Sequence, residues 1–518
     1  MYINYFSEIL FIFLFVLLFI FSCYLYYFKT SIVKLNNINN LENEKVLKYN
    51  TSLYPNLYSP IFYLFLLIVI NIFVFDIFVH FDFNNNNIIL VENHNINIFN
   101  KEFVKTKSDL MIKLFIFFLL IILLLTGNNY LKKLKIIDYQ YILILYSATI
   151  FINLLIYCVN LITFYLLIEI QGFSFIVLTA INYRDKYSLE SSLKYFILHC
   201  ISSSFMLYGI TLFYGLYGTT NIHDFYYLLN NIDYVFNLLD YVCITFILIG
   251  FLFKLYVAPF HFWISDIYNG NLIINTIYIS TIGFTCTFYL FFKFYNYVFI
   301  WFLEYISLLL FISAIISIIV GSFSIVYETN IKKIVAFSSI FTIGLLLINL
   351  LDNNYISHIN VIYYFILYII NIFVFLILIL PLYVMNIYNI HVDNIKWLNG
   401  YYLKNNIWTI FITISILSNI GLPGTSLFLS KLSVLNVIIN NYNMYVLYTI
   451  LFCSFLIFSY ALRIIISMYF LKFKSNTGFR IIPSINYIIS FLCICLLILI
   501  TFNQSFIYNI AEIIVYNI

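Results

Sequence analysis

Long apolar runs recur along the whole chain and constrain its fold more than any other feature. Most of them exceed the ~18 to 20 residues that a helix needs to cross a hydrocarbon core, whereas the strands of a membrane barrel would form ~10-residue alternating segments. Charged residues make up only 9% of the 518 residues, against about 25% in ordinary soluble domains. The chain is therefore predicted to be an all-α polytopic membrane protein.

The polar breaks between these runs predict about fourteen transmembrane helices, each with boundaries uncertain by roughly 2 to 4 residues. The predicted spans are 8–28, 59–80, 111–127, 140–158, 161–181, 193–217, 239–258, 272–294, 301–326, 332–351, 360–386, 407–440, 443–470 and 484–511. Most loop Lys and Arg residues fall on the side opposite the termini, so the positive-inside rule predicts that both termini face outward. The Asn-rich loops 36–50 and 82–100 are interpreted as flexible surface connections.

The cysteines and the remaining motifs exclude several kinds of chemistry. The eight cysteines are scattered through apolar spans without metal-ligand spacing, so they are interpreted as small core residues and no metal site is predicted. No haem, iron-sulfur or nucleotide motif is visible, and no cofactor is expected in this chain. The first 28 residues lack a small-residue cleavage site and are interpreted as a retained first span.

A lysine stands inside the apolar stretch GFLFKLYVAPFHFW, residues 250–263. A charge at mid-membrane costs ~2.5 to 3.5 kcal/mol, so such residues usually face the protein interior and mark an ion or proton path. Pro259 lacks an N–H and crowds the carbonyl of Leu255, which predicts that the helix opens beside Lys254. The alternative is a lysine that snorkels to the interface.

A second helix break is predicted in GLPGTSLFLSKLSVLN, residues 421–436, where Pro423 precedes Lys431. Proline-interrupted segments at corresponding places in two halves indicate inverted repeats and a midplane site. Glu169, in FYLLIEIQGFSF, is a further acid deep in a span, either on a proton path or in a packed ion pair. Glu190 and Lys194 are an i, i+4 pair, for which interface pairing and a proton-path role are equally open.

Four segments resemble a known family. They are LESSLKYFILHCISSSFMLYGITLFYGLYGTTNI (189–222), GFLFKLYVAPFHFWISDIYNG (250–270), YETNIKKIVAFSSI (327–340) and GLPGTSLFLSKLSVLN (421–436). They resemble the antiporter-like membrane chains of respiratory complex I, the proton-pumping NADH:ubiquinone oxidoreductase. The form VAPFHFWISDIYNG favours the chain-2 branch of that family.

The resemblance implies about fourteen helices with two inverted repeats and discontinuous helices 7 and 12. It divides the chain into an N-terminal three-helix segment (1–135), a first repeat (136–295), a second, inverted repeat (296–475) and a C-terminal helix (476–518). The family's proton-translocating residues fall at positions of this chain as follows: Glu169, Lys254, His261, Lys431, Glu190 and Lys194. In the family, the glutamate of helix 5 pairs with the lysine of broken helix 7.

Two positions depart from the family pattern. Gly283 stands where the family usually has a central lysine on helix 8, and Thr342 stands where a histidine is often found on helix 10. Either Lys293, Ser280, Thr281 and water take over the central relay, or this relay is different or weakened. A polar, hydrated cavity is predicted beside Gly283, contacted by Ser280, Thr281 or a side chain from a neighbouring helix.

The resemblance predicts a proton-translocating membrane-arm subunit of complex I, without a redox centre, in the mitochondrial inner membrane. The mitochondrial location rests on the abundance of residues with AT-rich codons, which suggests an organellar genome. Expected partners are other membrane-arm subunits, accessory subunits and lipid such as cardiolipin, but not nucleic acid. The alternatives are an Mrp-type cation/proton antiporter subunit and a structural membrane scaffold.

Overall fold

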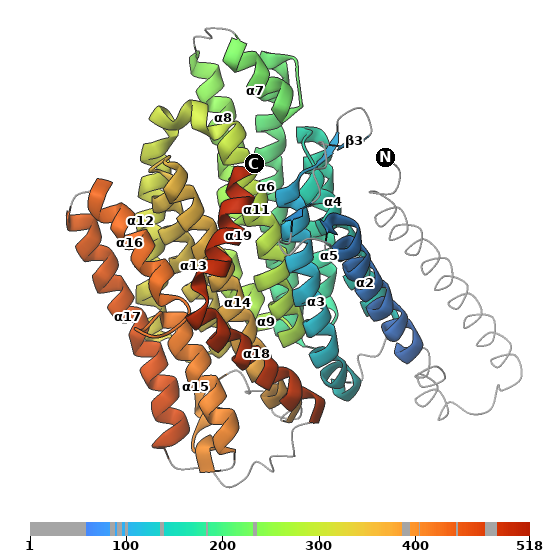
Figure 1. Cartoon of the computed structure of the whole chain (residues 1–518), viewed down its shortest axis with the longest axis vertical. Coiled ribbons are helices and arrows are strands. Elements are labelled where there is room, and N and C mark those ends of the chain that lie inside the picture. The colour runs from blue at the N-terminus through green and yellow to red at the C-terminus, as the bar shows by residue number, and fades with distance from the viewer. Residues whose placement is uncertain are drawn as a thin grey trace, which may run out of the picture.

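The computed structural model is a bundle of long helices with two small β-hairpins at one end (Figure 1). The structure describes the following residues: 58–82, 89–90, 96–98, 102–134, 139–182, 185–231, 236–385, 394–403, 405–441, 444–471 and 484–517. The predicted span 8–28 and the loop 36–50 lie outside the described residues.

Each predicted span after the first coincides with one helix or with a group of consecutive helices. In chain order the helices are α2 (Tyr58–His80), α3 (Lys107–Leu134), α4 (Tyr139–Tyr157), α5 (Leu161–Ala180), α6 (Lys186–Tyr217), α7 (Ile222–Asn231), α8 (Leu238–Lys254), α9 (Phe262–Gly270), α10 (Ile273–Ile277), η4 (Tyr278–Gly283), α11 (Phe284–Tyr297), η5 (Phe299–Phe302), α12 (Leu303–Tyr327), α13 (Ile331–Leu350), α14 (Tyr355–Met385), η6 (Ile395–Leu398), η7 (Tyr401–Leu403), α15 (Asn406–Ile420), α16 (Phe428–Asn441), α17 (Met444–Tyr469), α18 (Ser484–Phe502) and α19 (Gln504–Tyr516). The predicted fold class is thus confirmed.

Nine helical segments among the described residues are long and apolar enough to cross a membrane, or ten if α18 and α19 form one span. These two helices are bent by 83°, so the predicted span 484–511 consists of two helices. The predicted span 239–258 corresponds to α8, which ends at Lys254, and the predicted span 407–440 divides into α15 and α16 around the Gly-Pro-Gly segment, as the sequence predicted. The loop 82–100 was predicted as a flexible connection, but its described parts form strands.

The four short strands pair as two antiparallel hairpins. They are β1 (Phe81–Asp82), β2 (Ile89–Leu90), β3 (Ile96–Ile98) and β4 (Phe103–Lys105), and β1 pairs with β2 and β3 with β4. The β3–β4 hairpin contacts the helices through a bridge between Phe103 and Cys158. The hairpins therefore lie at the helix ends and leave the bundle core entirely helical.

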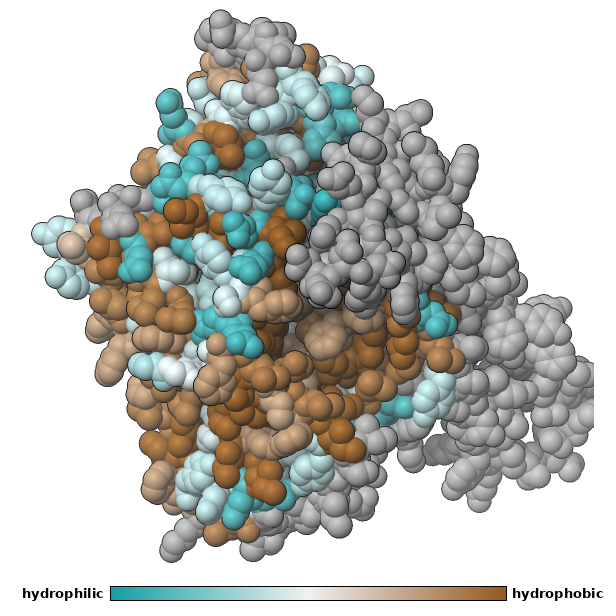
Figure 2. Space-filling view, viewed as in Figure 1, coloured by the Kyte–Doolittle hydropathy of each residue, from teal (hydrophilic) through white to brown (hydrophobic). Residues whose placement is uncertain are grey.

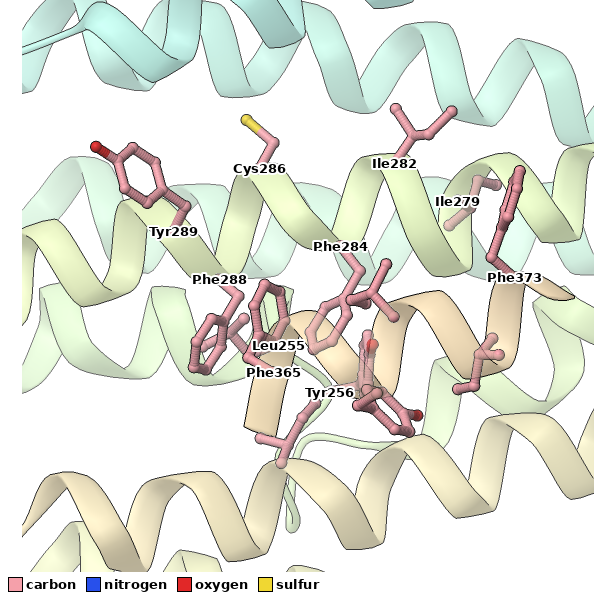
Figure 3. Packing of buried hydrophobic residues seen from close by; sticks show 14 of the residues in the cluster. Leu255, Tyr256, Ile279, Ile282, Phe284, Cys286, Phe288, Tyr289, Phe365 and Phe373 are labelled. Carbon is pink, nitrogen blue, oxygen red and sulfur yellow. The ribbon is translucent and has the colours of Figure 1, made fainter. Parts of the chain in front are cut away.

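The centre of the bundle is formed by α14 and by the continuous unit of α10, η4 and α11. In each of these, 94% of the most apolar stretch is buried inside the chain, against 33% in α17. Aromatic rings of α11 and α14 interdigitate there, with Phe288 and Phe365 stacked at 4.1 Å (Figure 3). Toward the outside, apolar side chains dominate the lower part of the face in Figure 2, as a lipid-facing surface requires.

Candidate functional site

The first broken helix ends at Lys254, where the sequence predicted an opening. Residues 255–261 form turns between α8 and α9, and Tyr256 adopts a left-handed backbone with φ of 49°. The indole Nε1–H of Trp263 donates at 3.1 Å to the backbone oxygen of Phe253, which also accepts from the N–H of Tyr256. This bond fixes the second half-helix against the end of the first, so the break is a defined structure next to the lysine.

A cavity of about 40 Å³ adjoins Lys254 between α5, α6, the break and η4. A water molecule needs ~10 to 15 Å³ of such volume, so the cavity has room for about three waters. Its polar lining comes from Gln171, His199, Lys254, Tyr256 and Thr287. Lys254 is partly buried and borders this cavity between helices, a position that favours a site within the bundle over the snorkelling alternative.

His199 lies between the cavity and Glu169. The imidazole Nδ1 is 3.6 Å from the Glu169 carboxylate, and the two side chains are 1% and 14% exposed. Lys254 attracts the Glu169 carboxylate electrostatically, but the two groups form no direct ion pair among the described residues. The Glu169–Lys254 pairing that the resemblance implies stays a prediction, and in this structure a histidine lies next to the acid.

The position of the His199 ring depends on the absence of a side chain at Gly172. A Cβ built on Gly172 would lie 1.8 Å from Nε2 of His199, so any side chain at 172 would collide with the ring. Neither ring nitrogen of His199, nor Nε2 of Gln171, has a hydrogen-bond partner among the described residues. Buried polar atoms of this kind are usually joined by internal water.

The region next to Gly283 takes one of the predicted forms, a cavity contacted by side chains from neighbouring helices. The predicted cavity is there, and Gly283 lines it. The ring of Phe175 occupies the space a side chain at 283 would take, 2.9 Å from a built Cβ. Ser280 and Thr281 do not line the cavity, because both hydroxyls donate to the backbone oxygen of Ile277 in their own helix.

Lys293 does not replace the missing central lysine. It lies ten residues beyond Gly283, which is roughly 15 Å along a helix. Its ammonium pairs with the buried carboxylate of Asp109 at 3.0 Å and donates to the backbone oxygen of Ile156. This pair fixes α11 to α3 and α4, and the cavity next to Gly283 receives its polar groups from neighbouring helices instead.

Glu190 and Lys194 form an ion pair, and a third residue joins them. The ammonium of Lys194 lies 2.8 Å from Glu190 and 2.8 Å from Asp266 on α9. All three side chains are partly exposed and border a groove of about 210 Å³. Tyr195 follows Lys194 and reaches the Lys254 cavity, where it stacks on Trp263 with ring centres 5.2 Å apart.

The second broken helix consists of α15 and α16, separated by residues 421–427. Gly421 and Gly424 have φ of 78° and 85°, which only glycine adopts without strain. The ammonium of Lys431 donates to the backbone oxygen of Ile420, the last residue of α15. The lysine therefore stabilises the negative end of a half-helix.

His261 lies in the first break, directly before α9. Its ring packs against exposed Phe262 at 4.4 Å and does not line the Lys254 cavity. His199 and Asp266 were not among the predicted site residues, although both stand in the segments that carry the family resemblance. The signals that could have identified them are a histidine deep in an apolar span and an acid directly after a helix break.

Two broken helices, each with a lysine at the break, in a bundle of membrane-length helices define an antiporter-like membrane protein. Residues 158–458 match the family described as NADH:quinone oxidoreductase/Mrp antiporter, TM. The chain belongs to this family.

Relatives and solved structures agree with this assignment. NADH-quinone oxidoreductase subunit N of Orientia tsutsugamushi is 29% identical over 421 residues, covering 77% of this chain and 85% of the relative. Subunit N of Buchnera aphidicola subsp. Acyrthosiphon pisum is 30% identical over 309 residues, covering 59% and 64%.

Two solved structures share the fold. A chain of respiratory complex I from Thermus thermophilus superposes with a TM-score of 0.69 at 18% identity, covering 87% of this chain and 94% of that one. A chain of the Mrp complex from Dietzia sp. gives 0.73 at 16% identity, covering 89% and 92%. At 18% and 16% identity, these two similarities show only that the fold is shared.

Proposed function

We propose that this chain is a proton-translocating membrane-arm subunit of an NADH:quinone oxidoreductase. The observation that carries the proposal is the cavity at the break after α8, where Lys254 meets His199 and, through it, Glu169. An ammonium, an imidazole and a carboxylate that follow one another in space can each give up and take back a proton. The relatives named subunit N support the choice of complex.

In this proposal, protons enter the site from the groove that holds Glu190, Lys194 and Asp266. Tyr195 reaches from the helix that forms the groove into the Lys254 cavity, and His199 lies one turn further along α6. Lys254 then stores the proton beside the helix break. Electron transfer from NADH to quinone takes place in partner subunits, and this chain carries no redox centre of its own.

The direct test is isolation of the chain from its native membranes. It should co-purify with NADH:quinone reductase activity, and NADH should drive proton uptake into vesicles that contain the assembled complex. Isolation of the chain in a complex without this activity would contradict the proposal. Other membrane-arm subunits should be present in the same preparation, and mass spectrometry would identify accessory subunits and bound cardiolipin.

A second candidate function is cation/proton exchange, because the family includes Mrp antiporters and the fold matches an Mrp chain. This alternative predicts that a sodium or potassium gradient drives proton movement in vesicles without NADH. We expect no such exchange. The same vesicles with NADH added provide the matched control for proton tightness.

The location in the mitochondrial inner membrane remains part of the proposal. The comparisons do not bear it out, since the relatives reported above are bacterial proteins. Fractionation of the source cells, with the chain followed by a specific antibody, would decide between a mitochondrial and a bacterial membrane.

A further inference from the structure

The last two helices of the chain meet at an elbow, Asn503 and Gln504, which has no role in the site described above. α18 and α19 are bent by 83° there, and α19 then packs against α14 on its way to the C-terminus (Figure 1). The buried residues of α19 are Ile507, Ala511 and Ile514. Gln504 precedes the first of them by three positions, so its side chain lies on the same face of the helix, toward the bundle.

Both ends of the Gln504 amide are hydrogen-bonded. Its Oε1 accepts a hydrogen bond of 2.8 Å from the hydroxyl of Tyr363 on α14, and its Nε2 donates to the backbone oxygen of Ser426 at 3.4 Å. A backbone oxygen can only accept, so the amide nitrogen must be the end that faces Ser426. Gln504 therefore links α14 to the segment between α15 and α16, which forms the second break.

Ser426 is held a second time, through its side chain. Its hydroxyl donates to Oδ1 of Asn371 on α14 at 3.0 Å, and Nδ2 of Asn371 donates to the backbone oxygen of Leu367 in the same helix at 2.9 Å. Ser426 and Asn371 are both fully buried. Because the carbonyl and the hydroxyl of Ser426 both bind other helices, α14 and α19 fix this end of the break from two sides.

Ser426 lies at the start of the half-helix that carries Lys431. The backbone oxygen of the next residue, Leu427, accepts the N–H of Lys431 at 3.0 Å, and the ammonium of Lys431 reaches back to the carbonyl of Ile420. Its stem passes close to Gly421, where a built Cβ would lie 2.9 Å from Cδ of the lysine. A shift of Ser426 would therefore move the base of Lys431 relative to the carbonyl that its ammonium binds.

The Gln504 side chain could serve the elbow itself or the second break. The end of α18 is completed by backbone bonds, since the N–H of Asn503 donates to the carbonyl of Leu499 at 3.0 Å and the N–H of Phe506 donates to that of Asn503 at 3.3 Å. The bonds of the glutamine side chain run instead to Tyr363 and Ser426, which belong to other elements. This pattern favours a role in holding the second break.

We propose that Gln504 is a positioning residue for proton transfer at Lys431. By holding Ser426, it keeps the first turn of α16 at the distance from which Lys431 reaches the last carbonyl of α15. Gln504 itself exchanges no proton. The inference rests on the proposed proton-translocating function and gives the C-terminal pair of helices a part in it.

Gln504→Met is the direct test, because methionine has a similar length and removes both hydrogen bonds. NADH-driven proton uptake by vesicles that contain the assembled complex should slow about fivefold, which corresponds to one hydrogen bond of ~1 kcal/mol. The amount of assembled complex is measured for every variant, so that a loss of protein is not counted as a loss of transfer. Unchanged proton uptake would overturn the proposal.

Tyr363→Phe and Tyr508→Phe form a matched pair that remains informative if the methionine variant fails to assemble. Each removes one hydroxyl from the contact between α14 and α19, where the two rings lie 5.7 Å apart. Tyr363 binds Gln504, so its variant should slow proton uptake, though less than Gln504→Met because the bond to Ser426 remains. Tyr508→Phe should behave like the unchanged chain. Equal losses in the pair would overturn the proposal, since packing between the two helices would explain them.

A double variant separates positioning from general stabilisation. If Gln504 acts through Lys431, Gln504→Met should add nothing to the loss caused by Lys431→Met, because no ammonium remains to be positioned. A glutamine that merely stabilises the fold would slow the Lys431→Met complex about fivefold further, since independent effects multiply in the rate. That result would overturn the positioning role.

Two single variants distinguish failure of this inference from failure of the proposed function. If Lys254→Met stops proton uptake and Lys431→Met leaves it normal, the positioning role is overturned and the proposed function stands. If Lys254→Met takes up protons normally, the proposed function fails at the first break, whereas the comparison of the single and double variants still decides the role of Gln504.

Discussion

The two broken helices have a similar backbone arrangement but different chemical groups around their lysines. In both, a lysine lies at the C-terminal end of the first half-helix, where unpaired carbonyls attract a cation. Lys254 is the last residue of α8, and Lys431 reaches back from α16 to the last carbonyl of α15. Only Lys254 adjoins a histidine that contacts a carboxylate.

The groups around the second lysine can only stabilise its charge, whereas those around the first can also accept its proton. A backbone carbonyl stabilises an ammonium group but does not take its proton, whereas an imidazole or a carboxylate does. No carboxylate among the described residues interacts with Lys431, whose described contact is with Ile420. The first break is therefore built to exchange protons locally, and the second is built to receive a proton from elsewhere.

The largest expected effect is that of Lys254→Met in the assembled complex. Methionine keeps the bulk and removes the titratable amine, and a positioned proton donor typically contributes at least about a hundredfold to a transfer rate. Proton uptake by vesicles energised with NADH should fall to background while the amount of assembled complex is unchanged. Normal uptake by this variant would remove the first break from the mechanism.

Lys431→Met should have the second-largest effect. It removes one charge-assisted hydrogen bond, worth ~1.5 to 3 kcal/mol, and leaves no carboxylate without its partner. We expect about a tenfold slower proton uptake, measured in the same vesicles, with assembly intact. A loss greater than that of Lys254→Met would reverse the comparison and place the limiting transfer at the second break.

Gly172→Ala tests whether proton transfer at the first break depends on the position of the His199 ring. The added Cβ would collide with the imidazole, and overpacking of this kind costs ~1 to 3 kcal/mol. The ring must move away from Glu169 or from the cavity, so proton uptake should fall severalfold. Gly215→Ala is the matched control, because nothing lies within 4 Å of a Cβ there, and it should behave like the unchanged chain. Equal behaviour of the two variants would show that the position of His199 is unimportant.

The sequence predicts the helices and both breaks, because hydropathy and proline act through local physics. It also predicts a lysine at the first break, where Lys254 borders the cavity. It does not predict that His199 stands next to Glu169, since this contact depends on how α5 and α6 pack at Gly172.

The direction of helices in the membrane and the fourfold division of the chain remain predictions. Thiol-reagent accessibility in sealed vesicles would test the former, with cysteines introduced at Lys132 and Arg480. We expect both positions on the matrix or cytoplasmic side, as the distribution of basic residues indicates. Labelling from the opposite side would invert the entry and exit faces of the proposed path.

The smallest expected effect concerns the groove that leads to the first break, where Lys194 has two carboxylate partners. Exposed ion pairs are worth ~0.2 to 1 kcal/mol, and Asp266→Asn or Glu190→Gln alone leaves the other partner in place. Each single variant should therefore slow NADH-driven proton uptake by less than about fivefold. The double variant leaves Lys194 without either acid, and because the three groups act as a unit its effect should exceed the sum of the two. Additive effects would instead show two independent surface pairs, which serve the contact between α6 and α9 and play no part in proton entry.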